Sequence, residues 1–247
     1  MRTFRIPSIR VHRAAPACSC LLLMMLWLLA ATPSSADPVD DAEGLWEYTG
    51  LVTRDGQSLP LTGVFLISEG VFVQQSIFNE EPSAKAGSMA HVGPYWAGGA
   101  GMRLTSNQTL SLDPKSDAPL RSAGVLQHDL KVERDGDNLT LTFGAGTSTV
   151  QTFRRLGAAS DTRLVKLKDG ALALADDYFI LVVGNESRVV SGYGTYEQNG
   201  PRLALDVIRW AESDGATVVN ERDVELSAEL VADALVLGDG RRIPLAP

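Results

Sequence analysis

The sequence predicts an all-β protein, and three features carry that prediction. Short runs of alternating apolar and polar residues follow one another from Asp37 onward. Asp-Gly or Asn-Gly pairs separate many of these runs, and such pairs favour tight hairpin turns because they tolerate positive φ. No stretch of ten or more residues shows a clear helical period. The pairs are Asp55-Gly56, Asp135-Gly136, Asp169-Gly170, Asn199-Gly200, Asp214-Gly215 and Asp239-Gly240.

Each predicted strand is a short run of alternating or β-branched residues that ends at a turn signal. The first series comprises 45–53, 63–68, 71–78, 102–112 with a turn near Asn107, 124–133, 138–143 and 148–156. The second comprises 163–168, 170–175, 178–183, 188–197, 202–208, 217–226 and 234–238. The segment "VELSAELVADAL" (224–235) comes nearest to a helix, yet its apolar positions also fit strand pieces around a turn.

The segment "NEEPSAKAGSMAHVGPYWAGGAG" (79–101) departs from the strand pattern because it is rich in Gly, Ala and Pro. Long loops in compact β-domains often serve a function. We therefore expect a loop here that covers the mouth of a barrel. His91, Tyr95 and Trp96 within it are suited either to contact an apolar ligand or to pin the loop to the rim.

The two series of strands resemble each other, which indicates either an internal repeat or convergent hairpin patterning. Residues 130–144 and 224–240 share a strand, a polar break and Asp-x-Leu-x-Leu. The small, polar segment 157–161 is the best linker. We expect a signal peptide over 1–36, a first β-domain over 37–157 and a second β-rich domain or degenerate repeat over 158–247. The second half forms a barrel of its own or adds strands to one larger enclosure.

The first 36 residues have the order of a secretory signal peptide. Four arginines precede an 11-residue apolar run (21–31), and Ser34 and Ala36 suit the −3 and −1 positions of a cleavage site. The run is too short to span a bilayer comfortably. Cleavage would also remove the only cysteines, Cys18 and Cys20. We expect a soluble protein, exported to the periplasm or secreted, without disulfides or thiolate chemistry. The long basic segment before the apolar run leaves an uncleaved anchor as the alternative.

The charge of the chain argues against nucleic-acid binding. Its 22 Lys and Arg residues against 30 Asp and Glu residues give a net charge of −8. Loss of the four signal arginines would bring the charge to −12, and such a surface repels phosphate backbones. The sequence contains no nucleophile elbow, metalloprotease motif, phosphate-binding glycine loop or dinucleotide fingerprint. We therefore expect no cofactor and no metal.

Gly44-x-Trp46 opens the first strand, and Arg154 or Arg155 ends the last strand of the first series. This arrangement resembles the lipocalin and wider calycin pattern over roughly residues 44–156. The resemblance implies an up-and-down β-barrel in which the indole closes one end and the arginine packs across it. Physically, a barrel of about eight strands needs a large side chain at its closed end, and a cation–π contact of about 0.5 to 2 kcal/mol would stabilise the pair. Trp46 is then structural.

The two histidines that follow the signal segment are the candidate acid or base groups. Alternation places His128 with Leu126 and Leu130 on an inward face, whereas Asp129 faces outward. An inward histidine is either a hydrogen-bonded core residue or a ligand-contacting group. His91 belongs to the predicted loop.

The candidate ligand-binding residues are spread over both halves. If the repeat is aligned by Val132 and Val224, Asn220 takes the position of His128, and the two could line one cavity. Otherwise Asn220 is an ordinary polar strand residue. The full candidate set for ligand contacts is Tyr95, Trp96, His128, Asn220, Tyr193 and Trp210.

Three hypotheses about function follow. The first is an exported lipocalin-like protein that binds a small, largely apolar molecule in a barrel cavity. The second is a cofactor-free isomerase, lyase or hydrolase of the same fold. It would use His128 or His91 as acid or base, with Tyr95, Asn220 or Arg209 stabilising developing charge. The third is an assembly role in the cell envelope without a small ligand.

Overall fold

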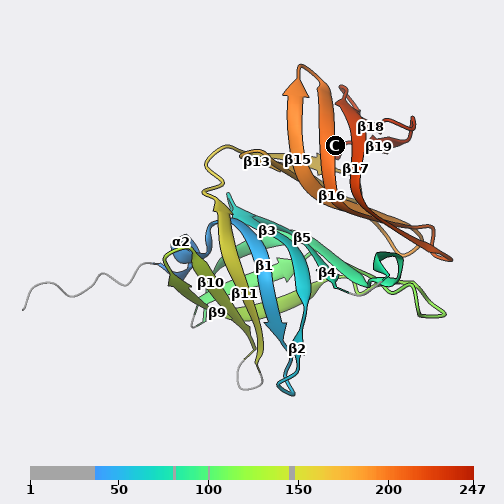
Figure 1. The fold of residues 1–247 in the computed structure, drawn as a ribbon. Coiled ribbons are helices and arrows are strands. Elements are labelled where there is room, and N and C mark those ends of the chain that lie inside the picture. Colours follow the sequence, from blue (N-terminus) through green and yellow to red (C-terminus); the bar gives the residue numbers. More distant parts are fainter. Residues whose placement is uncertain (1–36, 80–81, 100, 145–147) are drawn as a thin grey trace, which may run out of the picture. The chain divides into compact units, whose positions relative to one another are not determined.

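Antiparallel strands make up most of the described chain, which confirms the all-β prediction (Figure 1). The computed structural model describes residues 37–79, 82–99, 101–144 and 148–247. The predicted signal peptide and both cysteines therefore lie outside the described residues. The glycine of every predicted Asp-Gly or Asn-Gly pair has a positive φ, as tight turns require.

In the described residues 37–157, the structure has one short α-helix, one 3-10 turn and eleven strands that share a sheet. The helix is α2 (Pro38–Ala42), and the 3-10 turn is η1 (Ser83–Lys85). The strands are β1 (Gly44–Val52), β2 (Ser58–Leu59), β3 (Leu61–Ser68), β4 (Val71–Phe78), β5 (Ser88–Gly98), β6 (Gly101–Ser106), β7 (Gln108–Leu112), β8 (Leu120–Ser122), β9 (Leu126–Asp135), β10 (Asn138–Phe143) and β11 (Thr149–Gly157).

Eight of these strands form a closed antiparallel barrel, which we call the first barrel. Its order is β1-β3-β4-β5-β6-β9-β10-β11, and β11 pairs back with β1 to complete the circle. Strands β7 and β8 extend the sheet from β5, and the short β2 pairs with β1. This barrel is compatible with the lipocalin-like resemblance of the sequence.

The second half forms a separate antiparallel sheet in which every strand pairs with the next one along the chain. Its strands are β12 (Thr162–Leu167), β13 (Gly170–Ala175), β14 (Tyr178–Gly184), β15 (Val189–Asn199), β16 (Arg202–Ser213), β17 (Val218–Leu230), β18 (Ala234–Leu237) and β19 (Arg242–Pro244). A bridge between Leu167 and Leu245 brings the last strand back to the first, so this second barrel is nearly closed. The repeat and the domain boundaries stay predictions.

Each barrel has its own apolar interior. Trp46, Phe65 and Phe153 are fully enclosed in the first, and Phe179 and Leu181 in the second. A third apolar cluster contains residues from the opposite faces of the strands. Its members include Val64, Leu66, Val73 and Ile77 of the first sheet and Ala173, Ala175, Ile180 and Val182 of the second. Several strands are therefore buried on both faces.

The predicted loop over 79–101 is mostly a strand, so the prediction of a loop covering the barrel mouth is wrong. Residues 88–98 form β5, which pairs with β4 on one edge and with β7 and then β6 on the other. Pro94 lies where the partner changes from β7 to β6, so its missing N–H interrupts neither ladder. A Cβ at Gly93 would lie 1.9 Å from the carbonyl oxygen of Thr105, which explains a glycine within a strand.

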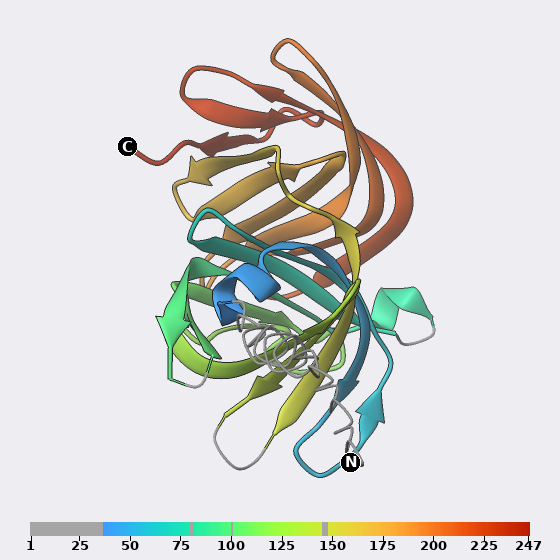
Figure 2. The same ribbon diagram turned by 90° about the vertical axis from the view of Figure 1, so that its left-hand side faces the viewer.

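Trp46 lies in the first barrel beside α2. The helix α2, blue in Figure 2, packs against β9, β6 and β5. The Trp46 side chain is 0% exposed, and its Nε1 donates a hydrogen bond of 2.8 Å to the carbonyl oxygen of Ala42. The guanidinium carbons of Arg155 and Arg134 lie 5.6 and 5.8 Å from the indole ring. A Cβ at Gly44, whose φ is +145°, would lie 3.2 Å from the indole Nε1.

Of the two arginines that the sequence left open, Arg155 is the one at the indole. Arg154 points to the opposite side and forms an ion pair of 2.6 Å with Glu47. Neighbouring residues on a strand face opposite sides, which is why only one of the two can reach the barrel interior. The second arginine over Trp46, Arg134, comes from β9 and was not predicted.

We expect Trp46→Ala to lower the free energy of unfolding by about 3 to 5 kcal/mol, because it removes a fully enclosed aromatic side chain and leaves a cavity. Trp96→Ala is the matched control, since Trp96 is 40% exposed and surface substitutions cost about 0.5 kcal/mol. Urea unfolding of both variants measures the difference. Equal losses would contradict the structural role of Trp46.

Candidate functional site

The first barrel contains a cavity of about 450 Å³ that is lined, in the described part of the chain, by seven apolar side chains, seven polar side chains and Gly144. Its only formally charged lining residue among the described residues is Arg54, which lies exposed in the turn between β1 and β2. The apolar walls are formed by Leu51, Leu61, Phe72, Phe78, Met89, Leu104 and Phe143. The polar lining residues are Arg54, Gln74, Ser76, His91, His128, Thr149 and Gln151.

The cavity lies toward the end of the barrel that is distant from Trp46. Strand β1 carries Trp46 near its beginning and Leu51 near its end, five residues further along. At about 3.3 Å per residue, these positions are separated by about 16 Å. The first barrel is therefore filled at one end by an indole and hollow at the other.

The cavity brings the two predicted histidines together. His91 comes from β5 and is buried, and His128 comes from β9 and is half-buried. His128 packs edge-on against Phe143, with 5.6 Å between ring centroids. Asp129 faces outward and forms an ion pair of 2.7 Å with Arg103, as the alternation predicted.

Burial keeps both imidazoles uncharged at neutral pH. Burial, and to a smaller extent the positive charge that His128 can carry, lower the pKa of His91 to about 4. Burial also lowers the pKa of His128. A neutral histidine has one hydrogen-bond donor and one acceptor, and Nδ1 of His91 is already within 3.3 Å of the Thr109 hydroxyl.

A second polar group joins the cavity wall. Gln74 of β4 donates from its Nε2 to the hydroxyl of Tyr48, and that hydroxyl donates to Oε1 of Gln151 over 3.1 Å. Burial raises the pKa of Tyr48 well above its ordinary value, so the phenol stays protonated. The hydrogen bonds to Tyr48 hold the side-chain amides of Gln74 and Gln151 on the cavity wall, and none of these groups carries a charge.

Tyr95 and Trp96 of β5 do not line this cavity. Tyr95 belongs to the same apolar cluster as Trp46, and its hydroxyl donates to the carboxylate of Glu43 over 2.5 Å. Trp96 faces outward and lies opposite Arg103 of β6. Their predicted loop is a strand, and its alternation separates their side chains.

The candidate residues of the second half also lie outside the cavity. Tyr193 is buried in the third apolar cluster, and burial raises its pKa to about 12. The Nδ2 of Asn220 donates to the backbone carbonyls of Ala84 and Ala86. Asn220 and Arg209 line a smaller hollow of about 210 Å³. The suggestion that His128 and Asn220 share one cavity is therefore wrong.

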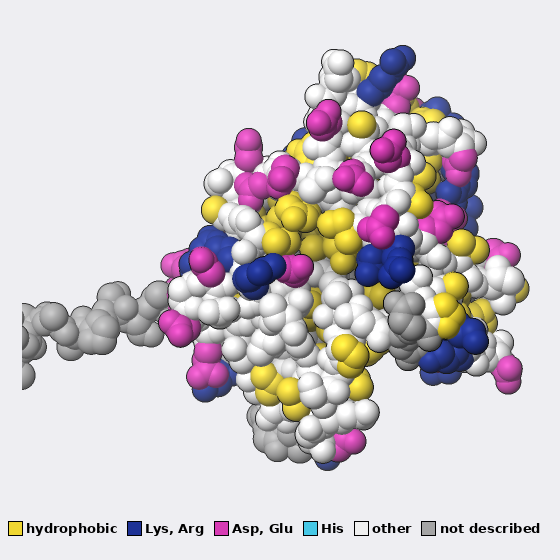
Figure 3. All heavy atoms as spheres, in the orientation of Figure 1, with side chains coloured by type: hydrophobic (Ala, Val, Ile, Leu, Met, Phe, Trp, Pro, Cys, Tyr) yellow, Lys and Arg dark blue, Asp and Glu magenta, His cyan; other side chains and the backbone are white. Residues whose placement is uncertain are grey.

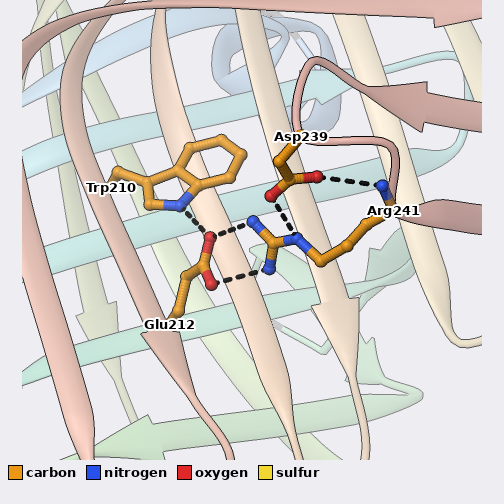
Figure 4. A network of polar contacts seen from close by, with 4 residues as sticks. All are labelled: Trp210, Glu212, Asp239 and Arg241. Carbon is orange, nitrogen blue, oxygen red and sulfur yellow. Dashed lines mark hydrogen bonds and ion pairs between the residues drawn. The ribbon is translucent and has the colours of Figure 1, made fainter.

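Trp210 belongs to a polar network in the second barrel (Figure 4). Its Nε1 donates to Glu212 over 2.5 Å, and Glu212 accepts two hydrogen bonds of 2.7 Å from Arg241. Arg241 is also paired with Asp239 over 2.6 Å. The indole is thus anchored to a carboxylate that a guanidinium already neutralises.

Glu212 and Arg241 line a hollow of about 500 Å³ at one end of the second barrel. Its other charged lining residues are Lys168, Asp169, Arg188, Asp214 and Arg242. Charged side chains are costly to desolvate. An apolar molecule is therefore matched better by the cavity of the first barrel, where Arg54 is the only charged lining residue in the part of the chain that the structure describes.

Charges of both signs are also mixed over the molecular face drawn in Figure 3. Some charged side chains of the described surface are paired, such as Lys131 with Glu133 and Arg242 with Asp233. Exposed pairs of this kind contribute about 0 to 1 kcal/mol each. This face therefore presents no extended region of one sign.

Sequence reasoning missed Gln74, Ser76, Tyr48 and Gln151. The alternation of "VFVQQSIF" places Gln74 and Ser76 on one face with Phe72 and Phe78. The opposite face carries apolar residues too, so the pattern did not show which face is inward. The mixture of polar and aromatic residues on one face of this strand was the signal in the sequence that could have indicated a cavity wall.

No protein-family model, curated protein or solved structure matches the chain. Within the described ranges, no group of three or more His, Cys, Asp or Glu residues is placed to hold a metal ion. None of the helices in that part of the chain has the length and apolar character needed to cross a membrane.

The depressed pKa of His91 predicts a stability that depends on pH. The unfolded chain binds a proton near pH 6.5, whereas folded His91 binds it only near pH 4. Stability is therefore complete above about pH 6.5 and falls as the pH decreases toward 4. We expect a loss of about 2 kcal/mol between pH 7 and pH 5, at about 1.36 kcal/mol per unit.

Urea unfolding at a series of pH values measures this loss. In His91→Gln the dependence between pH 7 and pH 5 should be much weaker, while Lys131→Gln, an exposed change on β9, should keep it. An unchanged dependence in His91→Gln would show that His91 is not the responsible group.

Proposed function

We propose that this chain is an exported, lipocalin-like protein that binds a small, largely apolar molecule in the cavity of the first barrel. The observation that carries this proposal is the cavity of about 450 Å³, whose described lining combines seven apolar side chains with six neutral polar ones. Ligand pockets typically have about 300 to 1,000 Å³ and this kind of lining.

The distribution of charge supports an uncharged ligand body. Gln74, Gln151 and both histidines are neutral at pH 7, so these described lining residues offer hydrogen bonds but no counter-ion. Among the described lining residues, Arg54 at the exposed turn is the one cation that could meet an acidic group near the rim. The signal-like segment over 1–36 supports export to the periplasm or beyond.

A second candidate function is catalysis in the same cavity. Two neutral histidines line it, and a neutral buried imidazole can accept a proton from a bound substrate. Tyr95, Asn220 and Arg209 lie outside the cavity and cannot contribute there. An acid or base role predicts that His128→Gln abolishes turnover, whereas binding alone predicts a modest loss of affinity.

The fluorescent, neutral compound N-phenyl-1-naphthylamine tests the binding proposal. We expect Met89→Trp to weaken its binding at least about tenfold, because the larger side chain occupies the space that Met89 of β5 borders. Fluorescence titration measures the affinity, and urea unfolding verifies that the variant is folded.

Val52→Trp is the matched control, because Val52 is 40% exposed on β1 and does not line the cavity. It should leave the affinity unchanged. Equal affinities of the two variants, or no binding to the unaltered protein, would contradict the proposal.

A further inference from the structure

A chain of hydroxyl groups lies behind His91. The hydroxyl of Ser106 donates to the backbone carbonyl of Gln108 over 2.6 Å. The hydroxyls of Ser106 and Thr109 are 3.0 Å apart, and the Thr109 hydroxyl is 3.3 Å from Nδ1 of His91. All three side chains are buried. We call these three residues the His91 relay.

The directions of these hydrogen bonds follow from counting hydrogens. A carbonyl oxygen can only accept, so the single hydroxyl hydrogen of Ser106 is used on Gln108. The hydrogen between Ser106 and Thr109 must then come from Thr109. Thr109 has no second hydrogen, so the bond to His91 requires a hydrogen on Nδ1.

The opposite direction would remove a hydrogen bond from a buried site. If Thr109 donated to His91, the oxygens of Ser106 and Thr109 would face each other at 3.0 Å without a hydrogen between them. Buried polar groups without partners are costly. The relay therefore favours one tautomer of neutral His91, with the proton on Nδ1.

The remaining ring nitrogen, Nε2, is then an acceptor. Across the described residues His91 makes no other hydrogen bond, and its Nε2 is not among the enclosed polar atoms that lack a partner. Nε2 therefore keeps some accessible surface, and His91 is part of the cavity lining. An unprotonated ring nitrogen at this position carries a lone pair.

We propose that His91 presents Nε2 as a fixed hydrogen-bond acceptor, so that the cavity selects apolar molecules that carry a hydroxyl or N–H donor. This inference rests on the proposed binding function and names the chemical class of its ligand. Burial of the imidazole keeps it uncharged at neutral pH, so the lone pair is available. A ligand with only acceptor atoms would leave Nε2 unpaired, which costs affinity.

The tautomer can be measured without any ligand. Long-range ¹H–¹⁵N correlation spectra of ¹⁵N-histidine-labelled protein at pH 7.5 distinguish a proton on Nδ1 from one on Nε2, with the His91 signals assigned by their loss in His91→Gln. We expect the Nδ1–H form, although the Nε2–H form predominates for histidine in water. Thr109→Val should return His91 to the Nε2–H form.

Thr105→Val is the matched control. Thr105 is a buried threonine on the neighbouring strand β6, and its hydroxyl oxygen has no partner among the described residues. The substitution has the same size and chemistry but leaves the His91 relay intact. It should keep the Nδ1–H form.

Two probes of one ring system then test the selection. 2-Naphthol carries a hydroxyl hydrogen, and 2-methoxynaphthalene does not. For each protein we compare the dissociation constant of 2-methoxynaphthalene with that of 2-naphthol. We expect this ratio to be about two- to tenfold larger in the unaltered protein than in Thr109→Val, because one net neutral hydrogen bond contributes about that factor to affinity. Thr105→Val should keep the original ratio.

The outcomes separate the two proposals. The inference about His91 is overturned by an Nε2–H form in the unaltered protein or by equal ratios in all three proteins. If either probe still binds, the proposed function stands. If neither these probes nor N-phenyl-1-naphthylamine binds, the proposed function fails and the ligand selection fails with it. The Nδ1–H form together with the changed ratio supports the inference.

Discussion

The antiparallel pairing of β1 with β11 is the constraint on which the first barrel depends, because it joins the first barrel strand to the last. Trp46 and Arg155 are partners in this pairing, so closing the sheet also places the guanidinium beside the indole. The helix α2 accepts the indole hydrogen bond through Ala42, and the positive φ of Gly44 brings the chain from the helix into the strand. One short segment thus closes the sheet and fills one end.

The hollow at the other end follows from the same arrangement. A barrel of about eight strands has room inside for side chains or for one small ligand. Phe65, Phe153 and Trp46 occupy the part near α2, whereas Ser76, Gln74 and His91 are too small or too polar to fill the remainder. The second barrel shares the strand pattern but surrounds its hollow with charged residues, so similar folds create sites of different chemistry.

The sequence predicted the strands well because alternation and Asp-Gly turns are local signals, and β4, β10 and β13 begin and end where the pattern placed them. The sequence did not predict β5, because Gly93 and Pro94 are typical of a loop. The structure explains Gly93 by the close approach of β6, and Pro94 by the change of the pairing strand from β7 to β6. Both histidines were identified as candidates. That both line one cavity was not predicted, because it depends on the order of strands around the barrel. Asn220 was assigned to the same cavity only because the repeat was aligned without knowledge of the strand order.

The most direct test of the central claim is an NMR titration of the protein with N-phenyl-1-naphthylamine, followed through backbone amide shifts. Binding in the first barrel predicts that the largest changes occur at cavity residues such as Met89, His91, Leu104 and His128. Changes centred on Val219 and Ile243 of the second barrel, or no changes at saturating probe, would contradict the account.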